Sequence, residues 1–216
     1  NFAGNANYSS ASNTAAITIA PATPAVSVIG LNFVYEGYPH AATGFAYGVG
    51  GIGDVLAPAV TFSYSGSGYG PTATPPTNVG TYTATASFAG NANYSPASDT
   101  ATIIINPVGV TVSVTGGTFV YDGTSHGATG FAYGVGGIAD VQNPPVTFTY
   151  VGTGATVYPS TATPPTNAGT YTATASFAGN SNYLPASNVA AITISQRPIE
   201  ITAVTDIKPY DGNTSS

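Results

Sequence analysis

Two histidines each follow an acidic residue by four positions, and they are the first candidates for chemistry in this chain. Glu36 precedes His40, and Asp122 precedes His126. A carboxylate beside an imidazole can hold a metal ion or move a proton, but zinc takes three or four ligands and each pair supplies two. We therefore interpret both histidines as structural or solvated side chains, and we expect no metal site and no catalytic group here.

Three aspartates are the second candidates, as ligands for calcium between repeats. Asp54 and Asp140 lie in glycine-rich segments, and Asp99 precedes the last strand expected in its repeat. Calcium takes six to eight oxygen ligands, several of them from carboxylates. The residue that corresponds to Asp99 in the next repeat is Asn188, which has no carboxylate. We do not expect a calcium site that recurs in every repeat.

The glycine-rich segment 48–53 is the third candidate, because such segments can cradle phosphate. A phosphate loop opens a helix and carries a lysine, whereas this segment is followed by no helical periodicity and has no lysine. Serines and threonines are abundant but lack an aspartate and histidine at nucleophile-like spacing. The chain also has no cysteine. We predict a turn here, and neither an enzyme nor a cofactor-binding protein.

The chain has 15 tyrosines, and tyrosine is the residue type here that is best suited to binding a ligand. Tyr38, Tyr69 and Tyr158 fall in turn-like or edge contexts, where an exposed ring could stack on a sugar or on a neighbouring chain. The alternative, that these rings pack within the fold, stays open. Ile104 stands where the other repeats carry threonine, and we predict that it lies in a contact between copies.

The amino-acid composition limits the classes of molecule that the chain is expected to bind. Of 216 residues only 5% are charged, against roughly 25% in an average domain, and the net charge is −6. Nucleic acids and anionic lipids need a basic surface, so neither is expected as a partner. No run approaches 18 apolar residues, so no membrane insertion is expected. The 43% hydrophobic content supplies a core, which argues against disorder.

One stretch, Gly80 to Asn91, returns almost unchanged at Gly169 to Asn180. Apolar residues occupy every second position, with threonine or serine between them, which is the period of a half-buried strand. The matching phenylalanines Phe2, Phe88 and Phe177 are spaced by 86 and 89 residues. The extra three residues fall within 151–160, where the first repeat has only 65–71, which indicates a loop or edge strand.

The repeat divides the chain into four expected parts. These are the last strands of a preceding repeat (1–20), two complete repeats (21–106 and 107–195) and the first strands of a following repeat (196–216). The simplest explanation of these partial repeats at both ends is that the sequence is part of a longer tandem array.

Each complete repeat has about seven short segments with strand periodicity, at the spacing of an all-β sandwich. An odd number of strands takes the chain in at one end of a sandwich and out at the other. The junctions leave about two residues between strands and contain a proline, which favours a stiff rod.

The ordered motifs resemble the MBG-type repeats of very large bacterial surface and secreted proteins. They are Tyr121-Asp122-Gly123-Thr124, the run from Pro165 to Tyr171, Asn182-Tyr183 and Ala191-Ile192-Thr193-Ile194. The resemblance covers nearly the whole chain. It implies tandem immunoglobulin-like β-sandwich modules at a bacterial cell surface or outside the cell, and it implies no ligand.

The sequence therefore favours a non-enzymatic structural module, either a stiff spacer or a self-associating filament subunit whose partners are other copies of itself. The low-charge outer faces support self-association. The alternative function is an adhesive module that binds a glycan or a host surface protein through its tyrosine-bearing loops.

Overall fold

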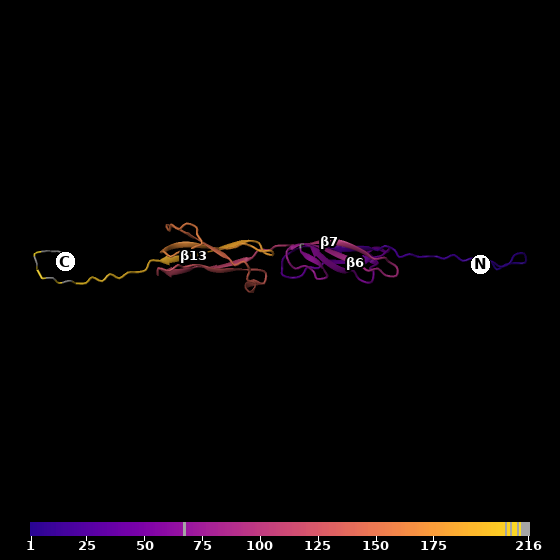
Figure 1. Cartoon of the computed structure of the whole chain (residues 1–216), viewed down its shortest axis with the longest axis horizontal. Coiled ribbons are helices and arrows are strands. Elements are labelled where there is room, and N and C mark those ends of the chain that lie inside the picture. Colours follow the sequence, from indigo (N-terminus) through magenta and orange to yellow (C-terminus); the bar gives the residue numbers. More distant parts are fainter. Residues whose placement is uncertain (67, 206, 208, 211, 213–216) are drawn as a thin grey trace. The chain divides into compact units, whose positions relative to one another are not determined.

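The computed structural model describes residues 1–66, 68–205, 207, 209–210 and 212. The described elements are strands and two short 3-10 turns, so the predicted all-β class is confirmed. The chain divides into two compact units, Asn1–Val108 and Gly109–Ser216 (Figure 1). We call them unit 1 and unit 2 and describe each by itself. The expected repeat boundaries stay predictions.

Unit 1 is a sandwich of two sheets. Its five-stranded sheet has the order β2-β7-β6-β4-β5, and β1 pairs with β3 in a second sheet. The described strands are β1 (Ala25–Ile29), β2 (Asn32–Val34), β3 (Thr43–Tyr47), β4 (Thr61–Gly66), β5 (Tyr69–Thr72), β6 (Gly80–Phe88) and β7 (Ala97–Asn106). A 3-10 turn, η1 (Gly51–Gly53), follows β3.

Unit 2 repeats this arrangement without the outermost strand. Its four-stranded sheet has the order β11-β12-β13-β9, and β10 pairs with β8. The described strands are β8 (Thr111–Thr115), β9 (Gly117–Val120), β10 (Thr129–Tyr133), β11 (Thr147–Gly152), β12 (Gly169–Phe177) and β13 (Ala186–Ser195). The turn η2 (Gly137–Ala139) corresponds to η1.

The segment 158–163, which the sequence suggests as a strand, forms an isolated bridge between Tyr150 and Thr161, and the Gly152 N–H donates to the Tyr158 carbonyl. The three additional residues of unit 2 lie just before it. They form a loop in which the backbone N–H of Thr170 donates to Thr156 Oγ1 and the Thr170 hydroxyl donates to the Thr153 carbonyl. Because Thr153 and Thr156 bond to Thr170 at the start of β12, the loop lies against that strand, and no strand equivalent to β5 is described.

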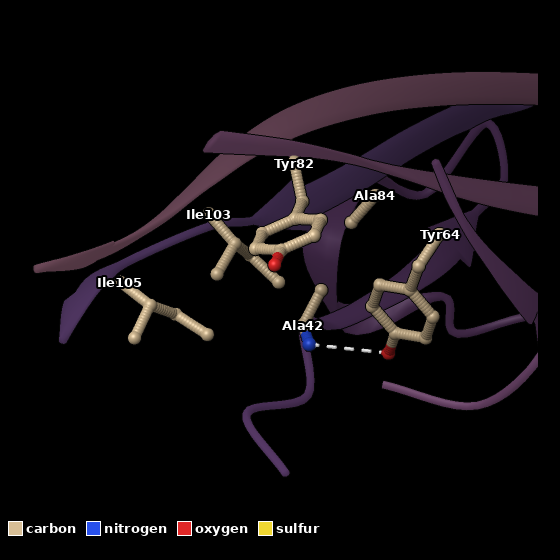
Figure 2. Close-up of a cluster of buried hydrophobic side chains, with 6 residues drawn as sticks. All are labelled: Ala42, Tyr64, Tyr82, Ala84, Ile103 and Ile105. Carbon is tan, nitrogen blue, oxygen red and sulfur yellow. Dashed lines mark hydrogen bonds between the residues drawn. The ribbon is translucent and has the colours of Figure 1, made fainter. Parts of the chain in front are cut away.

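The alternating stretch forms β6 in unit 1 and β12 in unit 2, and its apolar side faces the core as predicted. Tyr82 is 5% exposed and Phe88 is 1% exposed. Figure 2 shows the centre of the unit 1 core, where Tyr82 and Ala84 of β6 lie beside Ile103 and Ile105 of β7. The outward threonines leave the opposite face of the sheet polar.

The chain enters and leaves unit 1 at opposite ends. Near its start, the N–H of Ala22 donates to the carbonyl of Asn93, in the loop that joins β6 to β7. At the other end, Ile105 of β7 lies opposite Gly80, the first residue of β6. We call these the upstream and downstream ends. The final strand β7 therefore runs the length of the unit and exits downstream.

The N-terminal strand of each unit changes sheet partway along. In unit 1, β1 pairs with β3, and after Gly30 the chain continues as β2, which pairs in parallel with β7. A Cβ on Gly30 would lie 1.9 Å from the carbonyl oxygen of Thr102. In unit 2, a Cβ on Gly116 would lie 2.0 Å from the carbonyl oxygen of Ala191. A side chain does not fit at either crossover.

Residues 1–20 are not packed in a sandwich, but they contain one turn that is also found in both units. Phe2 bridges to Ala11, and Asn5 Oδ1 accepts the N–H groups of Asn7 and Tyr8. Ile17 is 89% exposed, whereas Ile103, at the same repeat position in unit 1, is completely buried.

Candidate functional site

The two histidines are structural in position. His40 stacks on Phe33 with ring centroids 4.1 Å apart, and His126 stacks on Phe119 at 4.2 Å. Each backbone N–H donates to the carbonyl of a proline, Pro76 for His40 and Pro165 for His126. These contacts fix the turn after β2 or β9 against the loop before β6 or β12.

The acidic partner differs between the two units. Asp122 Oδ1 lies 3.1 Å from His126 Nε2 and also accepts the N–H of Thr124. The Thr124 backbone bond is the largest cause that lowers the Asp122 pKa, and the His126 charge adds to it. In unit 1, His40 is 8% exposed, and its Nε2 has no hydrogen-bond partner among the described residues. The two acid–histidine pairs thus have the same spacing in the sequence, but the hydrogen bond to histidine Nε2 is found only in unit 2.

The aspartates of the glycine-rich segments close a loop. In unit 2, the Tyr183 hydroxyl donates to Asp140 Oδ2 at 2.8 Å, and the same carboxylate oxygen accepts the N–H of Gly136 at 3.3 Å. The N–H of Val135 donates to the Tyr183 oxygen at 3.1 Å. Gln142 Nε2 donates to Asp140 Oδ1 at 2.7 Å. These donors occupy both carboxylate oxygens.

Hydrogen bonding stabilises the charged form of Asp140. The Tyr183 hydroxyl is the largest cause that lowers its pKa, and the bonds from Gly136 and Gln142 contribute in the same direction, while partial burial opposes them. In unit 1, Tyr94, Asp54 and Val49 make the corresponding bonds, but Leu56 stands at the position of Gln142 and supplies no donor. Both aspartates therefore have a structural role in closing the loop.

An asparagine anchors the same corner in each unit. Asn91 Oδ1 accepts the N–H groups of Asn93 and Tyr94, and Asn91 Nδ2 donates to the Ala57 carbonyl at 2.8 Å. Asn180 makes the equivalent bonds in unit 2, including one to the Asn143 carbonyl at 3.0 Å. This corner and the aspartate network fix the loops of the upstream end.

Tyr69 and Tyr158, which the sequence suggests as ligand contacts, are half-buried and pack against the core of their unit. Tyr69 lies edge-on to Tyr82 with ring centroids 5.5 Å apart, and its hydroxyl donates to the Thr74 carbonyl. Tyr158 lies edge-on to Tyr171 at 5.4 Å, and its hydroxyl donates to the Thr163 carbonyl. This packing accounts for both rings without a ligand.

Tyr82 and Tyr171 make the tyrosine-corner contact that is typical of immunoglobulin-like sandwiches. The Tyr82 hydroxyl donates to the Asn78 carbonyl, and the Tyr171 hydroxyl donates to the Asn167 carbonyl, each at 2.8 Å. Burial is the main cause that raises the pKa of both phenols, and the neighbouring tyrosine adds to it. Sequence analysis missed this role, although the spacing of four residues from asparagine to tyrosine is visible in both repeats.

Of the other two predicted contact residues, Tyr38 is exposed and Ile104 is half-buried. Tyr38 follows β2 and is 70% exposed. Ile104 points out of the five-stranded sheet, half-buried, and lies opposite Thr81 of β6 and Asn32 of β2. Two strands, β6 and β4, separate β7 from β5, which carries Tyr69. Ile104 and Tyr69 therefore lie on different strands that are not neighbours in the sheet.

Aliphatic side chains at the glycine-rich turns were not singled out from the sequence. Val49 and Ile52 are 84% and 75% exposed, and their counterparts Val135 and Ile138 are 48% and 74% exposed. The turn predicted for segment 48–53 is present as the 3-10 turn η1, and η2 corresponds to it in unit 2.

Within the described residues, no three histidine, aspartate or glutamate side chains come together as metal ligands. The same part of the chain contains no helix of the length and hydropathy needed to cross a membrane.

No family model matches this chain, and no curated protein matches it either. Among solved structures, the chain is similar to one described as "Sidekick-1 immunoglobulin domains 1-5", with 12% sequence identity and a TM-score of 0.27. The match covers 81% of this chain and 40% of that chain, so this chain spans less than half the length of the structure it matches. The two packed sheets of each unit carry the assignment of an immunoglobulin-like β-sandwich.

Proposed function

We propose that this chain is a non-enzymatic structural repeat module of a long extracellular bacterial protein, acting as a stiff spacer or as a subunit of a self-associating filament. The resemblance to MBG-type repeats supports the bacterial and extracellular parts of this proposal. Asp54, Asp140 and the two histidines contact loop residues, whereas Asp99 lies in β7 and accepts the N–H of Thr100.

The path of the chain through each unit is the observation that carries the spacer role. Unit 1 receives the chain at its upstream end and releases it after Asn106 at its downstream end. In unit 2, Val135 lies beside Tyr183 upstream, and Ser195 ends β13 downstream beside Val120. Only residues 107–110 separate β7 from β8. Because the chain enters and leaves a module at opposite ends, each further copy lengthens the tandem array.

Stiffness can be measured on the intact chain, because the absence of cysteine makes introduced thiols unique. Spin labels on Thr100→Cys and Ser187→Cys, both at exposed positions, report the distance between the two units. A stiff spacer gives one narrow distance distribution, and a glycine-serine insert after Val108 broadens it. Equally broad distributions for the two proteins would refute stiffness.

Self-association is supported by the character of the outer sheet faces. The outward positions of β6 and β7 are mostly threonines and serines, with Asn106 at the end of β7, Ile104 as the aliphatic exception and few charges to repel a second copy. Sedimentation over a concentration series should show assembly that Ile104→Asp weakens and Ile104→Thr alters less. A monomer at every concentration, with isolated particles in electron micrographs, would leave the spacer role alone.

The adhesive alternative is favoured by Tyr38, whose ring is 70% exposed on a turn. A glycan array probed with the intact chain should be blank for a spacer. Binding that Tyr38→Ala abolishes would instead support the adhesive function.

A further inference from the structure

We propose that the parallel strand pair at the downstream end of each unit is a mechanical clamp that resists tension along the chain. The pairs are β2 with β7 in unit 1 and β9 with β13 in unit 2. This inference deepens the proposed function, because a clamp matters for a module that is pulled from both ends.

The direction of force on each strand follows from topology. Tension pulls the N-terminal strand towards the upstream end, where the chain enters, and pulls β7 towards the downstream end, where the chain exits. β2 and β7 run in the same direction, so the two forces slide one strand along the other. All hydrogen bonds of a sheared pair carry force together, whereas a pair pulled open from one end loses them one at a time.

The N-terminal strand is attached to both sheets of the sandwich. β1 is held by five residue pairs with β3, and β2 by three pairs with β7. Of these partners, only β7 is connected directly to the downstream tension. The β2–β7 pair therefore lies between the two points where force enters the unit.

Side chains reinforce the clamp in both units. Asn106 Nδ2 donates to the Phe33 carbonyl at 3.0 Å, and the N–H of Tyr35 donates to the Asn106 carbonyl at 2.8 Å. In unit 2, Ser195 occupies the position of Asn106, and its hydroxyl donates to the Phe119 carbonyl at 3.0 Å. The N–H of Tyr121 donates to the Ser195 carbonyl at 2.9 Å. Two different residues thus make the same bond at the same place.

Single-molecule unfolding of the intact chain, pulled through its two termini at constant force, tests the clamp. Asn106→Ala removes a side-chain bond across the parallel pair. Thr61→Val is the matched control, because it removes the Thr61 hydroxyl bond to the Ser87 carbonyl across the antiparallel pair of β4 and β6. In unit 2, Ser195→Ala and its control Thr147→Val form the corresponding pair.

Two unfolding events are expected for each chain, one per unit. The clamp variants should speed the forced unfolding of their own unit about two- to tenfold, which corresponds to the loss of one hydrogen bond. The controls should change that rate less than twofold, and the unaltered unit provides an internal reference. Asn106→Ser, which installs the unit 2 residue, should restore the slow rate and also serves if Asn106→Ala fails to fold.

Equal acceleration by clamp and control variants would overturn the clamp, as would acceleration by the controls alone. Neither result bears on the spin-label distances that test the spacer, so failure of the clamp and failure of the proposed function can be told apart.

Discussion

Phenol hydroxyls close loops at four places in the described part of each unit, one of them the Tyr69 or Tyr158 bond described above. In unit 1, Tyr64 accepts the N–H of Ala42, Tyr82 donates to the Asn78 carbonyl and Tyr94 donates to Asp54. A buried ring supplies apolar area while its hydroxyl satisfies a backbone or carboxylate group. The chain has no cysteine, so these contacts close its loops where other small domains use disulfides.

Removing the tyrosine-corner hydroxyl should destabilise unit 1. We expect Tyr82→Phe to lower the free energy of unfolding by about 0.5–1.5 kcal/mol, because the Asn78 carbonyl loses its donor while the ring stays in place. Urea denaturation measures this change. Tyr38→Phe is the control, since its exposed ring should make it nearly silent, and an equal loss in both variants would contradict the assignment.

Acid should weaken unit 2 through Asp140. Hydrogen bonds, first from Tyr183, hold its folded-state pKa below the value of about 3.9 that an unfolded aspartate has. A depressed carboxyl pKa contributes stability that is present above the unfolded value and is lost as pH falls through the folded value.

Urea midpoints of unit 2 from pH 6 to pH 3 test this contribution. The intact chain should lose stability below about pH 4, and Asp140→Asn should be less stable at pH 6 and less dependent on acid. An unchanged pH dependence in Asp140→Asn would show that other carboxylates, such as Asp122, account for the loss.

At the scale of elements, the glycines at the crossovers allow the N-terminal strand of each unit to pair first in one sheet and then in the other. Gly30 and Gly116 follow β1 and β8, and each passes against a backbone carbonyl on β7 or β13. A carbonyl in the middle of a strand cannot move without breaking the ladder around it. The crossover in turn places β2 and β9 beside the last strand of their units.

We expect Gly30→Ala to destabilise unit 1 by about 1–3 kcal/mol, since the new methyl group overlaps the Thr102 carbonyl. Gly53→Ala is the matched control, because a Cβ there meets nothing within 4 Å. Thermal or urea unfolding compares the two variants. Equal stability of the two would mean that the crossover has room that the structure does not show.

At the scale of the whole molecule, the same repeat position is core or surface according to what surrounds it. Ile103 is completely buried between the two sheets of unit 1, and Ile17 is 89% exposed in the N-terminal segment. Local sequence is nearly identical at the two places, so burial is a property of the assembled unit.

Truncating the two isoleucines should therefore give opposite results. Ile103→Ala should cost about 2–5 kcal/mol because it leaves a cavity in the core. Ile17→Ala should change the free energy of unfolding by less than about 0.5 kcal/mol. Calorimetry of the intact chain measures both, and a large effect at Ile17 would show that residues 1–20 are packed in solution.

The sequence alone determined the all-β class, the alternation of β6 and β12 and the position of the inserted loop, because these follow from local periodicity and from comparing one repeat with the next. Tyr82 was assigned to the core from that alternation, and it lies there. Its bond to Asn78 was equally local but was not recognised.

The tertiary structure decided the contacts between residues distant in the chain. Tyr94 meets Asp54 across 40 positions, and Asn106 meets Phe33 across 73. Periodicity says which face a side chain occupies, but it does not say which strand lies alongside. Strand order set the parallel pairing of β2 with β7, and with it the path of tension that we infer.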